Sequence, residues 1–342
     1  MQEREQVKSE REDIMRKRMV KKNAGKVLSI CMLAVLCTEN STYIKADSEG
    51  EMILDMSTDT DKDGYSDYLE TTIYGTDPNV SDVTFYRWNQ DYIHVDYQGN
   101  ERWKNYDGTT KSYGGSQMWF YDDTRKEEPD KKATDYIVQT FGCGLIAISD
   151  VLLYLAQSDE AYQTKRTNQV LFNENGTYNY ESYLNYVYGI NKSYLRIINN
   201  YGSNKTLLTT GLGAYSMCNN LGLTVQWCSS KKRMLPRIID MLEQDIPVPL
   251  CISYNEKGGG VHFYDWRPTE SEPFYFGVKN YKSTVEGHFV VVTGLLTDKV
   301  KNQTILEISS WGRRYYVNYD EFLEYVNNYS NYVESGIAYI KK

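Results

Sequence analysis

The clearest hydrophobic pattern in this 342-residue chain is an apolar stretch that follows Cys143, within residues 139–155. Ser149 and Asp150 are its main polar interruptions. Apolar residues that recur three and four positions apart form one face of a helix, and here they are Leu145, Ile148, Leu152 and Leu155, widened by Ile146 and Leu153. A helix that is apolar most of the way round is predicted to lie buried at the centre of the fold.

The second half of the chain predicts a mixture of helices and strands. Helices are predicted over residues 183–200, 205–219 and 231–244, the last one broken or offset at Pro236. Strands are predicted over 222–227, 246–254, 287–294 and 305–310. The last two strands form a hairpin, so His288 at the start of one should meet Ser309 and Ser310 at the end of the other.

The N-terminus carries a pattern typical of export. Residues 16–26 are basic and residues 27–38 form a 12-residue apolar run, which suits a signal peptide and is too short to span a bilayer comfortably. We therefore predict a secreted protein with an export segment at 1–46. Retention at the cell surface stays open, and membrane contact is expected only if this segment remains uncleaved.

Composition changes this picture in two respects. The net charge of −8 argues against a nucleic-acid partner. Four cysteines follow the export segment, too few for a disulfide scaffold in a chain this long, and a bond between Cys218 and Cys228 is left open.

Cys143 is the first candidate for chemistry. It lies between two glycines just before the apolar helix, where free backbone N–H groups and the helix dipole favour a thiolate. The alternative is a buried structural cysteine. A cysteine nucleophile needs an imidazole, and the chain has three histidines. His288 is favoured because a strand holds it, His262 is the second choice or a residue of the substrate cleft, and His94 has no motif around it.

An acidic loop between Asp59 and Glu70 has the spacing of a calcium site. Carboxylates at alternate positions of a tightly wound loop point inward and supply the oxygen ligands that Ca²⁺ prefers, while Gly64 permits the sharp turn. The predicted ligands are Asp59, Asp61, Asp63, the carbonyl of Tyr65, Asp67 and Glu70, with Asp77 as a further candidate. A solvated acidic loop without a metal is the alternative.

This loop and the YGTDPN that follows resemble a single thrombospondin type 3 repeat, or a related bacterial calcium-binding repeat, over residues 57–80. The resemblance implies one calcium-clamped segment, at 47–82, with structural Ca²⁺. Residues 83–130, rich in Tyr, Trp, Gly and Asp, are interpreted as an aromatic connecting segment that leads to the main domain at 131–342.

The main domain resembles the papain-like C39 peptidases and their exported C39-like relatives. The resemblance rests on the order of Q-x-x-x-C-G, an apolar helix, an IPV strand, GHFVVVTG and S-W-G. It implies an α+β papain-like fold, with a helical part whose central helix bears the cysteine and packs on an antiparallel sheet carrying the histidine. It further implies Cys143 as nucleophile, His288 as base and Gln139 as oxyanion donor. Ser309 and Ser310 occupy the slot where the family has Asp or Asn, and Ser309 is the predicted third member.

The leading hypothesis is therefore an exported, calcium-binding cysteine peptidase that acts on a peptide or protein substrate. Two alternatives remain. One is a C39-like binding protein with weak or lost catalysis, suggested by serine at the third position. The other is an amidase or transpeptidase that uses the same Cys–His pair.

Overall fold

The structure is a computed structural model of the protein. It describes residues 58–87, 92–99, 110–120, 129–197, 204–254, 259–264, 285–328 and 334–342, and the side chains of 129–133 lie outside this description. The predicted export segment, 1–46, also lies outside the described residues. The described chain divides into two compact units. The first holds the residues up to Thr84 together with Thr297–Asn302, and the second holds the remainder.

The first unit contains the acidic loop and two short helical elements, α2 (Asp67–Leu69) and the π-helical turn η1 (Glu70–Tyr74). The side chain of Ser66 caps α2 by accepting a hydrogen bond from the Leu69 N–H. Gly75 ends η1 in the left-handed conformation. Strand β1 (Val83–Tyr86) follows.

The second unit combines helices with a mostly antiparallel sheet, as the α+β prediction requires. Its helices are α3 (Pro129–Phe141), α4 (Cys143–Ser158), α5 (Tyr180–Ile190), α6 (Lys205–Cys218), α7 (Lys231–Glu243) and α8 (Tyr319–Asn328). Its main strands are β4 (Thr224–Cys228), β5 (Val248–Ile252), β6 (His288–Asp298), β7 (Gln303–Ser310), β8 (Arg313–Asn318) and β9 (Gly336–Lys341).

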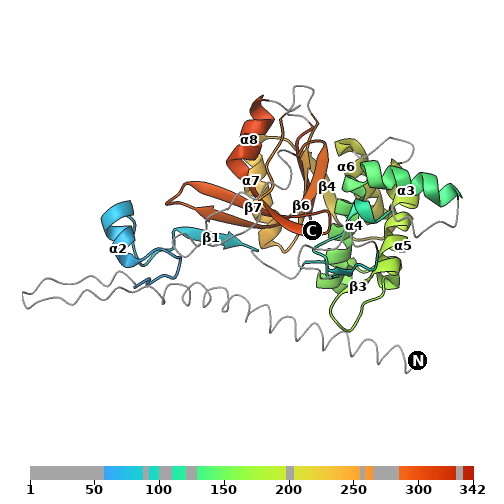
Figure 1. Ribbon diagram of the computed structural model, residues 1–342, viewed down its shortest axis with the longest axis horizontal. Coiled ribbons are helices and arrows are strands. Elements are labelled where there is room, and N and C mark those ends of the chain that lie inside the picture. Colours follow the sequence, from blue (N-terminus) through green and yellow to red (C-terminus); the bar gives the residue numbers. More distant parts are fainter. Residues whose placement is uncertain are drawn as a thin grey trace, which may run out of the picture. The chain divides into compact units, whose positions relative to one another are not determined.

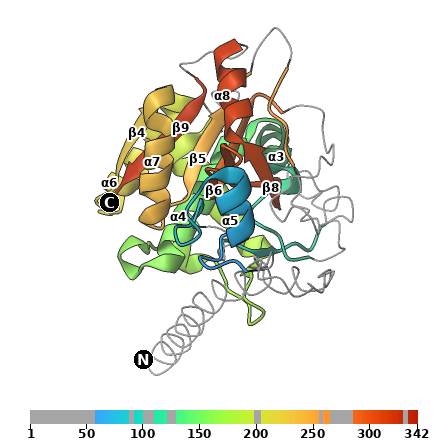
Figure 2. The same ribbon diagram turned by 90° about the vertical axis from the view of Figure 1, so that its left-hand side faces the viewer.

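The main strands follow one another in the order β4-β9-β5-β6-β7-β8, and β1 pairs with β6 outside this path. β6 and β7 are neighbours, and His288 begins β6 while Ser310 ends β7, so the predicted hairpin is confirmed. Two shorter strands, β2 (Val95–Asp96) and β3 (Tyr178–Asn179), pair in parallel as a separate sheet. Figure 1 shows α3, α4, α5 and α6 gathered at one side of this unit, and Figure 2 shows α7 beside β5 and β9.

The predicted central helix is confirmed as α4, in which every residue from Gly144 to Ala156 is buried. Residues Thr134–Phe141 of α3 and the whole of α4 meet at Gly142 with a bend of 86°. A Cβ atom on Gly142 would lie 2.2 Å from the Val138 carbonyl oxygen, so only glycine fits at this bend. None of the described helices is by itself long and apolar enough to cross a bilayer; the bent α3–α4 pair reaches the necessary length and composition only jointly.

The aromatic segment, interpreted from sequence as a connection, contributes to the hydrophobic core. Tyr92, Ile93, Tyr97, Trp119 and Phe120 are all buried there. Tyr97 stacks on Trp119, with ring centroids 5.2 Å apart, and both rings meet Tyr180 of α5 edge to face. The described part of residues 83–130 is therefore built into the second unit from Phe85 onward.

The helix predicted over 231–244 is present as α7, whereas the helix predicted over 183–200 is shorter than predicted. Helix α7 runs without a break through Pro236, because its buried face of Met234, Ile238, Met241 and Leu242 packs into the core and offsets the helix-breaking effect of proline. The helix predicted over 183–200 ends earlier: α5 gives way at Asn191 to the π-helical turn η6 (Asn191–Leu195). The Asn191 side chain accepts a hydrogen bond from the Ile197 N–H, which competes with further helix.

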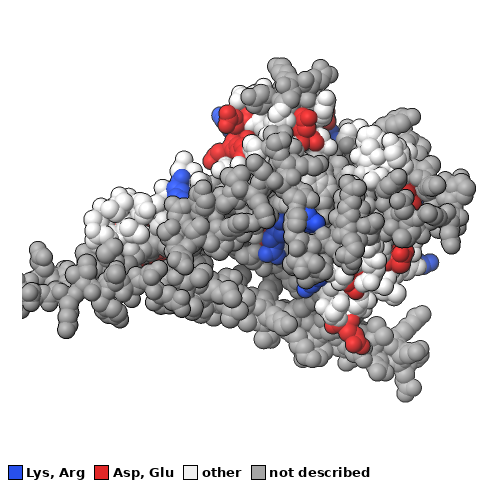
Figure 3. Space-filling model, in the orientation of Figure 1, with Lys and Arg blue, Asp and Glu red and all other residues white. Residues whose placement is uncertain are grey.

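Charge on the described surface is mixed. On the face shown in Figure 3, described acidic side chains lie in several separate groups, with basic side chains between them. One such group covers α8, whose first turn holds Asp320 and Glu321. Acidic residues at a helix N-terminus stabilise the helix through their favourable interaction with its dipole.

Candidate functional site

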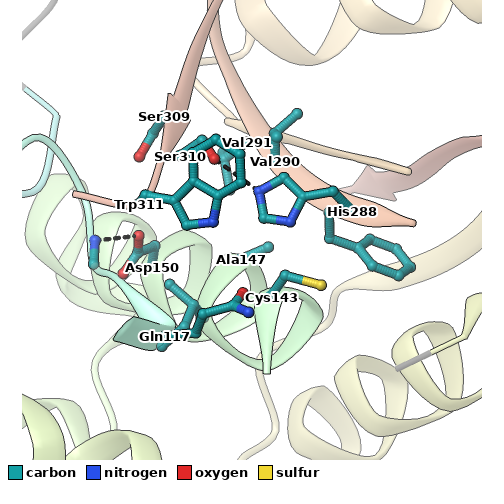
Figure 4. Close-up of a pocket in the computed structure, with 13 residues that line it drawn as sticks. Gln117, Cys143, Ala147, Asp150, His288, Val290, Val291, Ser309, Ser310 and Trp311 are labelled. Atoms are coloured by element: carbon teal, nitrogen blue, oxygen red, sulfur yellow. Dashed lines mark hydrogen bonds between the residues drawn. The ribbon is translucent and has the colours of Figure 1, made fainter. Parts of the chain in front are cut away.

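A small cavity lies in the second unit where the N-terminus of α4 meets the start of β6 and the end of β7 (Figure 4). Its volume is about 20 Å³, which is room for one water molecule. The side chains that line it include Gln117, Cys143, Asp150, His288, Ser309, Ser310 and Trp311. The fold therefore brings together four stretches of the chain, which are separate in the sequence.

Cys143 opens α4, and its thiol is half-buried beside His288. Burial raises the pKa of this thiol, whereas the backbone N–H groups of Phe289, Gly144 and Cys143 itself stabilise the thiolate and act in the opposite direction. Burial has the larger effect. The helix N-terminus predicted to favour the thiolate is present, but by itself it does not make the Cys143 thiol unusually acidic.

His288 is buried and held from two sides. Its Nε2 atom lies 2.8 Å from the hydroxyl oxygen of Ser310. Its ring stacks on Trp311, with centroids 4.5 Å apart and planes inclined by 22°. Figure 4 shows the other ring nitrogen, Nδ1, on the side where Cys143 lies. The imidazole is thus fixed in orientation between a hydroxyl, an indole and the thiol.

Trp311 covers His288 because of an unusual turn. Ser310 pairs with Arg313, so Trp311 and Gly312 alone connect β7 to β8. Both have positive φ, 50° for Trp311 and 75° for Gly312, as a type I′ hairpin turn requires. A bulky residue in this conformation is strained, and such strain is commonest at functional sites.

Ser309, the predicted third member, has a different partner. Its hydroxyl donates a hydrogen bond of 2.9 Å to the carbonyl oxygen of Tyr113, and Figure 4 shows it turned away from His288. Successive residues of a strand point in opposite directions, so only one serine of the pair can face the imidazole. Ser310 is the one that does so.

The glutamine beside the thiol is Gln117 rather than Gln139. Gln139 belongs to the last turn of α3, before the bend at Gly142, and it is not among the residues that line the cavity. Gln117 begins the turn η3 (Gln117–Phe120) and lines the cavity. Its Nε2 donates a hydrogen bond of 2.7 Å to the carbonyl oxygen of Gln139. Glycines at 114 and 115, shortly before Gln117, are the sequence signal that the backbone passes close to neighbouring side chains here.

The other two histidines lie outside this cavity. His262 Nδ1 lies 2.5 Å from the carboxylate of Glu321, which also accepts hydrogen bonds from the His262 N–H and the Tyr264 hydroxyl. His94 is half-buried, and its Nδ1 meets the carbonyl oxygen of Ser112 at 2.5 Å. The structure therefore pairs His262 with an acid of α8 and leaves His288 as the histidine beside Cys143.

Asp150 is a polar residue of the cavity to which the sequence reasoning gave no role. It follows Cys143 by two turns of α4 and is only 1% exposed. One carboxylate oxygen accepts from the Gly115 N–H at 2.8 Å, and the other accepts from the Tyr183 hydroxyl at 2.6 Å. Burial raises the pKa of Asp150 to about 7, although both hydrogen bonds lower it.

The acidic loop of the first unit forms a compact carboxylate cluster. Oxygen atoms of Asp59, Asp61 and Asp63 lie within 4.8 Å of one another, and so do those of Asp63, Glu70 and Asp82. Asp63, shared by both groups, is buried, and so are Glu70 and Asp82. Asp82 lies beyond the predicted loop. It is too far from Glu70 in the sequence to belong to the loop motif, so the motif gave no signal for it.

Two of the predicted ligands, Asp67 and Asp77, are placed differently. The Asp67 carboxylate accepts from the N–H and hydroxyl of Thr60, at 2.8 and 2.7 Å, and lies outside both groups. Asp77 is exposed and accepts hydrogen bonds from Asn79. Tyr65 is buried, and its phenol donates to Asp298 at 2.7 Å, which anchors the loop within its own unit.

The cluster fits a hard divalent cation. Burial, reinforced by neighbouring carboxylates, raises the pKa of Asp61 to about 6 and that of Glu70 to about 7. One oxygen each of Asp61, Glu70 and Asp82 is buried and has no hydrogen-bond partner among the described residues. Lys299 approaches the Asp82 carboxylate only to 3.8 Å. Burying carboxylates without a positive charge or a hydrogen-bond donor nearby is unfavourable. A Ca²⁺ ion, which takes six to eight oxygen ligands, would supply the positive charge.

Comparison with known families bears on this cluster. Residues 59–81 match the family model of the bacterial TSP3 repeat. Repeats of this kind generally bind calcium and are typical of extracellular proteins. No curated protein matches the chain, and no solved structure matches it either. The chain therefore carries one bacterial TSP3 repeat, at residues 59–81, followed by an α+β unit with a cysteine–histidine cavity.

Proposed function

We propose that this chain is an exported, calcium-binding cysteine peptidase of papain-like fold that hydrolyses peptide bonds with Cys143 and His288. One observation carries the proposal: both residues line a single cavity, in which Ser310 and Trp311 fix the imidazole. Nucleophile, base and a polar orienting group are what covalent catalysis by cysteine requires.

The reaction follows from these positions. The Cys143 proton passes to His288, and the thiolate attacks the carbonyl carbon of the scissile bond. His288 then gives the proton to the leaving amine, and the acyl thioester remains on Cys143. His288 next takes a proton from water, which attacks the thioester carbon; the C–S bond breaks, the acid is released, and His288 returns the proton to the Cys143 sulfur. Ser310 accepts from the Nε2–H of the imidazolium and so stabilises it, more weakly than a carboxylate would.

The oxyanion needs hydrogen-bond donors near the thiol. The backbone N–H of Cys143 is one candidate. Gln117 is the other, in place of Gln139, because its amide has two N–H groups and its hydrogen bond to the Gln139 carbonyl engages one of them. This assignment replaces the glutamine implied by family resemblance with the one that lines the cavity.

The acidic cluster is proposed to hold structural Ca²⁺, with Asp59, Asp61, Asp63, Glu70 and Asp82 as carboxylate ligands. Extracellular calcium would keep such a site filled, which agrees with export through the basic and apolar segment at 1–46. The cation would supply charge compensation in this unit.

A C39-like binding protein without catalysis is the second candidate. The raised pKa of Cys143 favours it, because a neutral thiol is a poor nucleophile. The hydroxyl of Ser310 in place of a carboxylate points in the same direction. Amidase or transpeptidase chemistry would use the same groups as hydrolysis of peptides.

The test is the rate at which iodoacetamide alkylates Cys143 as a function of pH, followed by mass spectrometry of the Cys143 peptide. The exposed Cys218 in the same sample serves as an internal reference. A thiolate–imidazolium pair should react rapidly well below the ordinary thiol pKa of about 8.5, and His288→Ala should abolish that reactivity. An ordinary thiol profile that ignores His288→Ala would leave the binding protein as the better description.

A further inference from the structure

A short segment that ends at Gln117 connects the β7–β8 side of the cavity to the α4 side. Within this strap, defined as residues 112–117, the Tyr113 N–H donates to the Gly312 carbonyl at 2.7 Å, and the Gly312 N–H donates to the Gly115 carbonyl at 2.9 Å. On the opposite side, the Gly115 N–H donates to Asp150. The strap is thus fastened to the β7–β8 turn and to the helix that carries Cys143.

The strap runs too close to its neighbours for side chains at its centre. A Cβ atom on Gly115 would lie 1.8 Å from the Tyr183 hydroxyl oxygen, and one on Gly114 would lie 2.0 Å from the Ser309 hydroxyl oxygen. Tyr183 is also the second donor to Asp150. Asp150, Tyr183 and Gly115 therefore form one closely fitted group.

The buried acid is an unfavourable choice for stability alone. Asp150 and its neighbour Ser149 interrupt an apolar stretch of α4, and no basic group is among the causes that shift the pKa of Asp150. An apolar side chain of similar size would avoid the cost of burying a carboxylate. What the carboxylate provides is an acceptor for a backbone N–H two residues before the cavity glutamine.

We propose that Asp150 is a positioning residue, which fixes the strap on α4 and thereby holds the Gln117 amide where the oxyanion forms at Cys143. The inference rests on the proposed function. Because Asp150 and Cys143 belong to the same helix, the hydrogen bond to Gly115 sets the position of Gln117 relative to the thiol. Asp150 itself does not touch the substrate.

The experiment compares two reactions of Cys143. A peptide aldehyde forms a hemithioacetal, whose oxygen occupies the oxyanion position, whereas alkylation by iodoacetamide creates no oxyanion. Asp150→Ala should weaken aldehyde binding about 10- to 100-fold, as expected when an oxyanion donor is misplaced, and leave the alkylation rate unchanged. Asp150→Asn should restore binding, because its amide oxygen still accepts from Gly115 while its NH₂ group donates to Tyr183.

A double-mutant cycle shows whether Asp150 acts through Gln117. In a Gln117→Ala background, Asp150→Ala should weaken aldehyde binding no further. Ser149→Ala is the matched control, since Ser149 is the adjacent buried residue of α4 and its hydroxyl has no hydrogen-bond partner among the described residues. Gly115→Ala should also weaken aldehyde binding, because the added methyl group displaces the strap. This variant takes the place of Asp150→Ala if Asp150→Ala does not fold.

Hydrogen exchange tests the positioning role of Asp150 separately from the proposed peptidase activity. The Gly115 amide should exchange faster in Asp150→Ala than in the wild type or in Ser149→Ala. Unchanged exchange, or additive losses of aldehyde affinity in the cycle, would overturn the positioning role while the peptidase proposal stands. A wild-type protein that neither binds the aldehyde nor shows a reactive Cys143 would overturn the peptidase proposal, and the role of Asp150 with it.

Discussion

At the scale of single residues, the polar partner of the His288 imidazole is a neutral hydroxyl, that of Ser310. Ser310 is buried, so its hydrogen bond to the imidazole is not in competition with bulk water. Trp311 adds a flat surface that restricts rotation of the ring. Orientation of the His288 imidazole thus depends on two weak contacts acting together.

Ser310→Ala should lower the rate of peptide hydrolysis about 2- to 10-fold, which corresponds to the loss of one neutral hydrogen bond. The change should also reduce the reactivity of Cys143 at low pH, because the imidazolium loses an acceptor. Ser309→Ala is the control: it removes the bond to the Tyr113 carbonyl and should leave the pH profile of Cys143 unchanged. Equal profiles for wild type and Ser310→Ala would remove Ser310 from the proposed mechanism.

Asp150 makes a separate prediction for stability. Its pKa is about 7 in the folded protein and about 4 in an unfolded chain. Between these values the folded state holds a proton that the unfolded state has lost, so this residue lowers the free energy of unfolding as pH rises. Asp150→Asn should therefore be more stable than wild type at pH 8 by up to about 4 kcal/mol, with a smaller difference at pH 5.

Urea unfolding at both pH values measures this difference. Ser149→Ala provides the comparison, since its effect on the free energy of unfolding should not depend on pH. A stability difference between Asp150→Asn and wild type that is the same at pH 5 and pH 8 would contradict titration of Asp150 in this range.

At the scale of elements, the TSP3 repeat depends on a residue outside its loop motif. Asp82 lies just before β1, and its carboxylate joins those of Asp63 and Glu70. The Asp82 N–H also donates to Asp63 at 2.6 Å. The end of the repeat is thus folded back onto its middle.

Asp82→Asn should weaken Ca²⁺ binding at least about tenfold, because calcium affinity rises with the number of charged ligands. Titration calorimetry on calcium-free protein measures the change. Asp77→Asn is the matched control, since Asp77 belongs to the same repeat but is exposed and bonded to Asn79. If the two variants bound calcium alike, Asp82 would not be a ligand.

At the scale of the whole molecule, calcium should reverse the pH dependence of stability. Without the ion, the raised pKa values of Asp61 and Glu70 mean that the folded state binds protons more tightly than the unfolded chain. The melting temperature of calcium-free protein should then fall as pH rises from about 4 to about 7. With calcium it should rise over the same range, because the ion binds only deprotonated ligands.

Melting curves recorded with saturating calcium and after its removal test this reversal. Addition of calcium at pH 7 should raise the melting temperature, since the ion binds the folded state alone. Curves that coincide at every pH would mean that the acidic cluster holds no ion that stabilises the fold.

The elements that could be predicted from sequence are those with a strong local signal. Helix α4 and the β6–β7 hairpin have clear periodicity and turn residues, and the acidic loop has a motif of fixed spacing. Cys143 and His288 meet because these elements are present and the sheet aligns them. Local patterns therefore sufficed for the framework of the cavity.

The residues that could not be predicted are brought in by tertiary contacts. Gln117 reaches the cavity because two glycines let the strap pass between Tyr183 and Ser309, a fit that no spacing rule encodes. Asp82 joins the acidic cluster through the folding-back of the repeat. The choice between Ser309 and Ser310 depends on which face of β7 meets the imidazole. Each of these three placements depends on tertiary contacts, which the local sequence does not specify.

The contact between Trp311 and His288 has an optical consequence. An indole loses fluorescence when a protonated imidazole lies against it, and here the two rings are stacked. The emission of Trp311 should therefore fall as His288 gains a proton. The chain has six tryptophans, so subtracting the emission of a Trp311→Phe variant isolates this one. Titrating that difference would follow the charge of the proposed catalytic base in the unlabelled protein, without substrate or inhibitor.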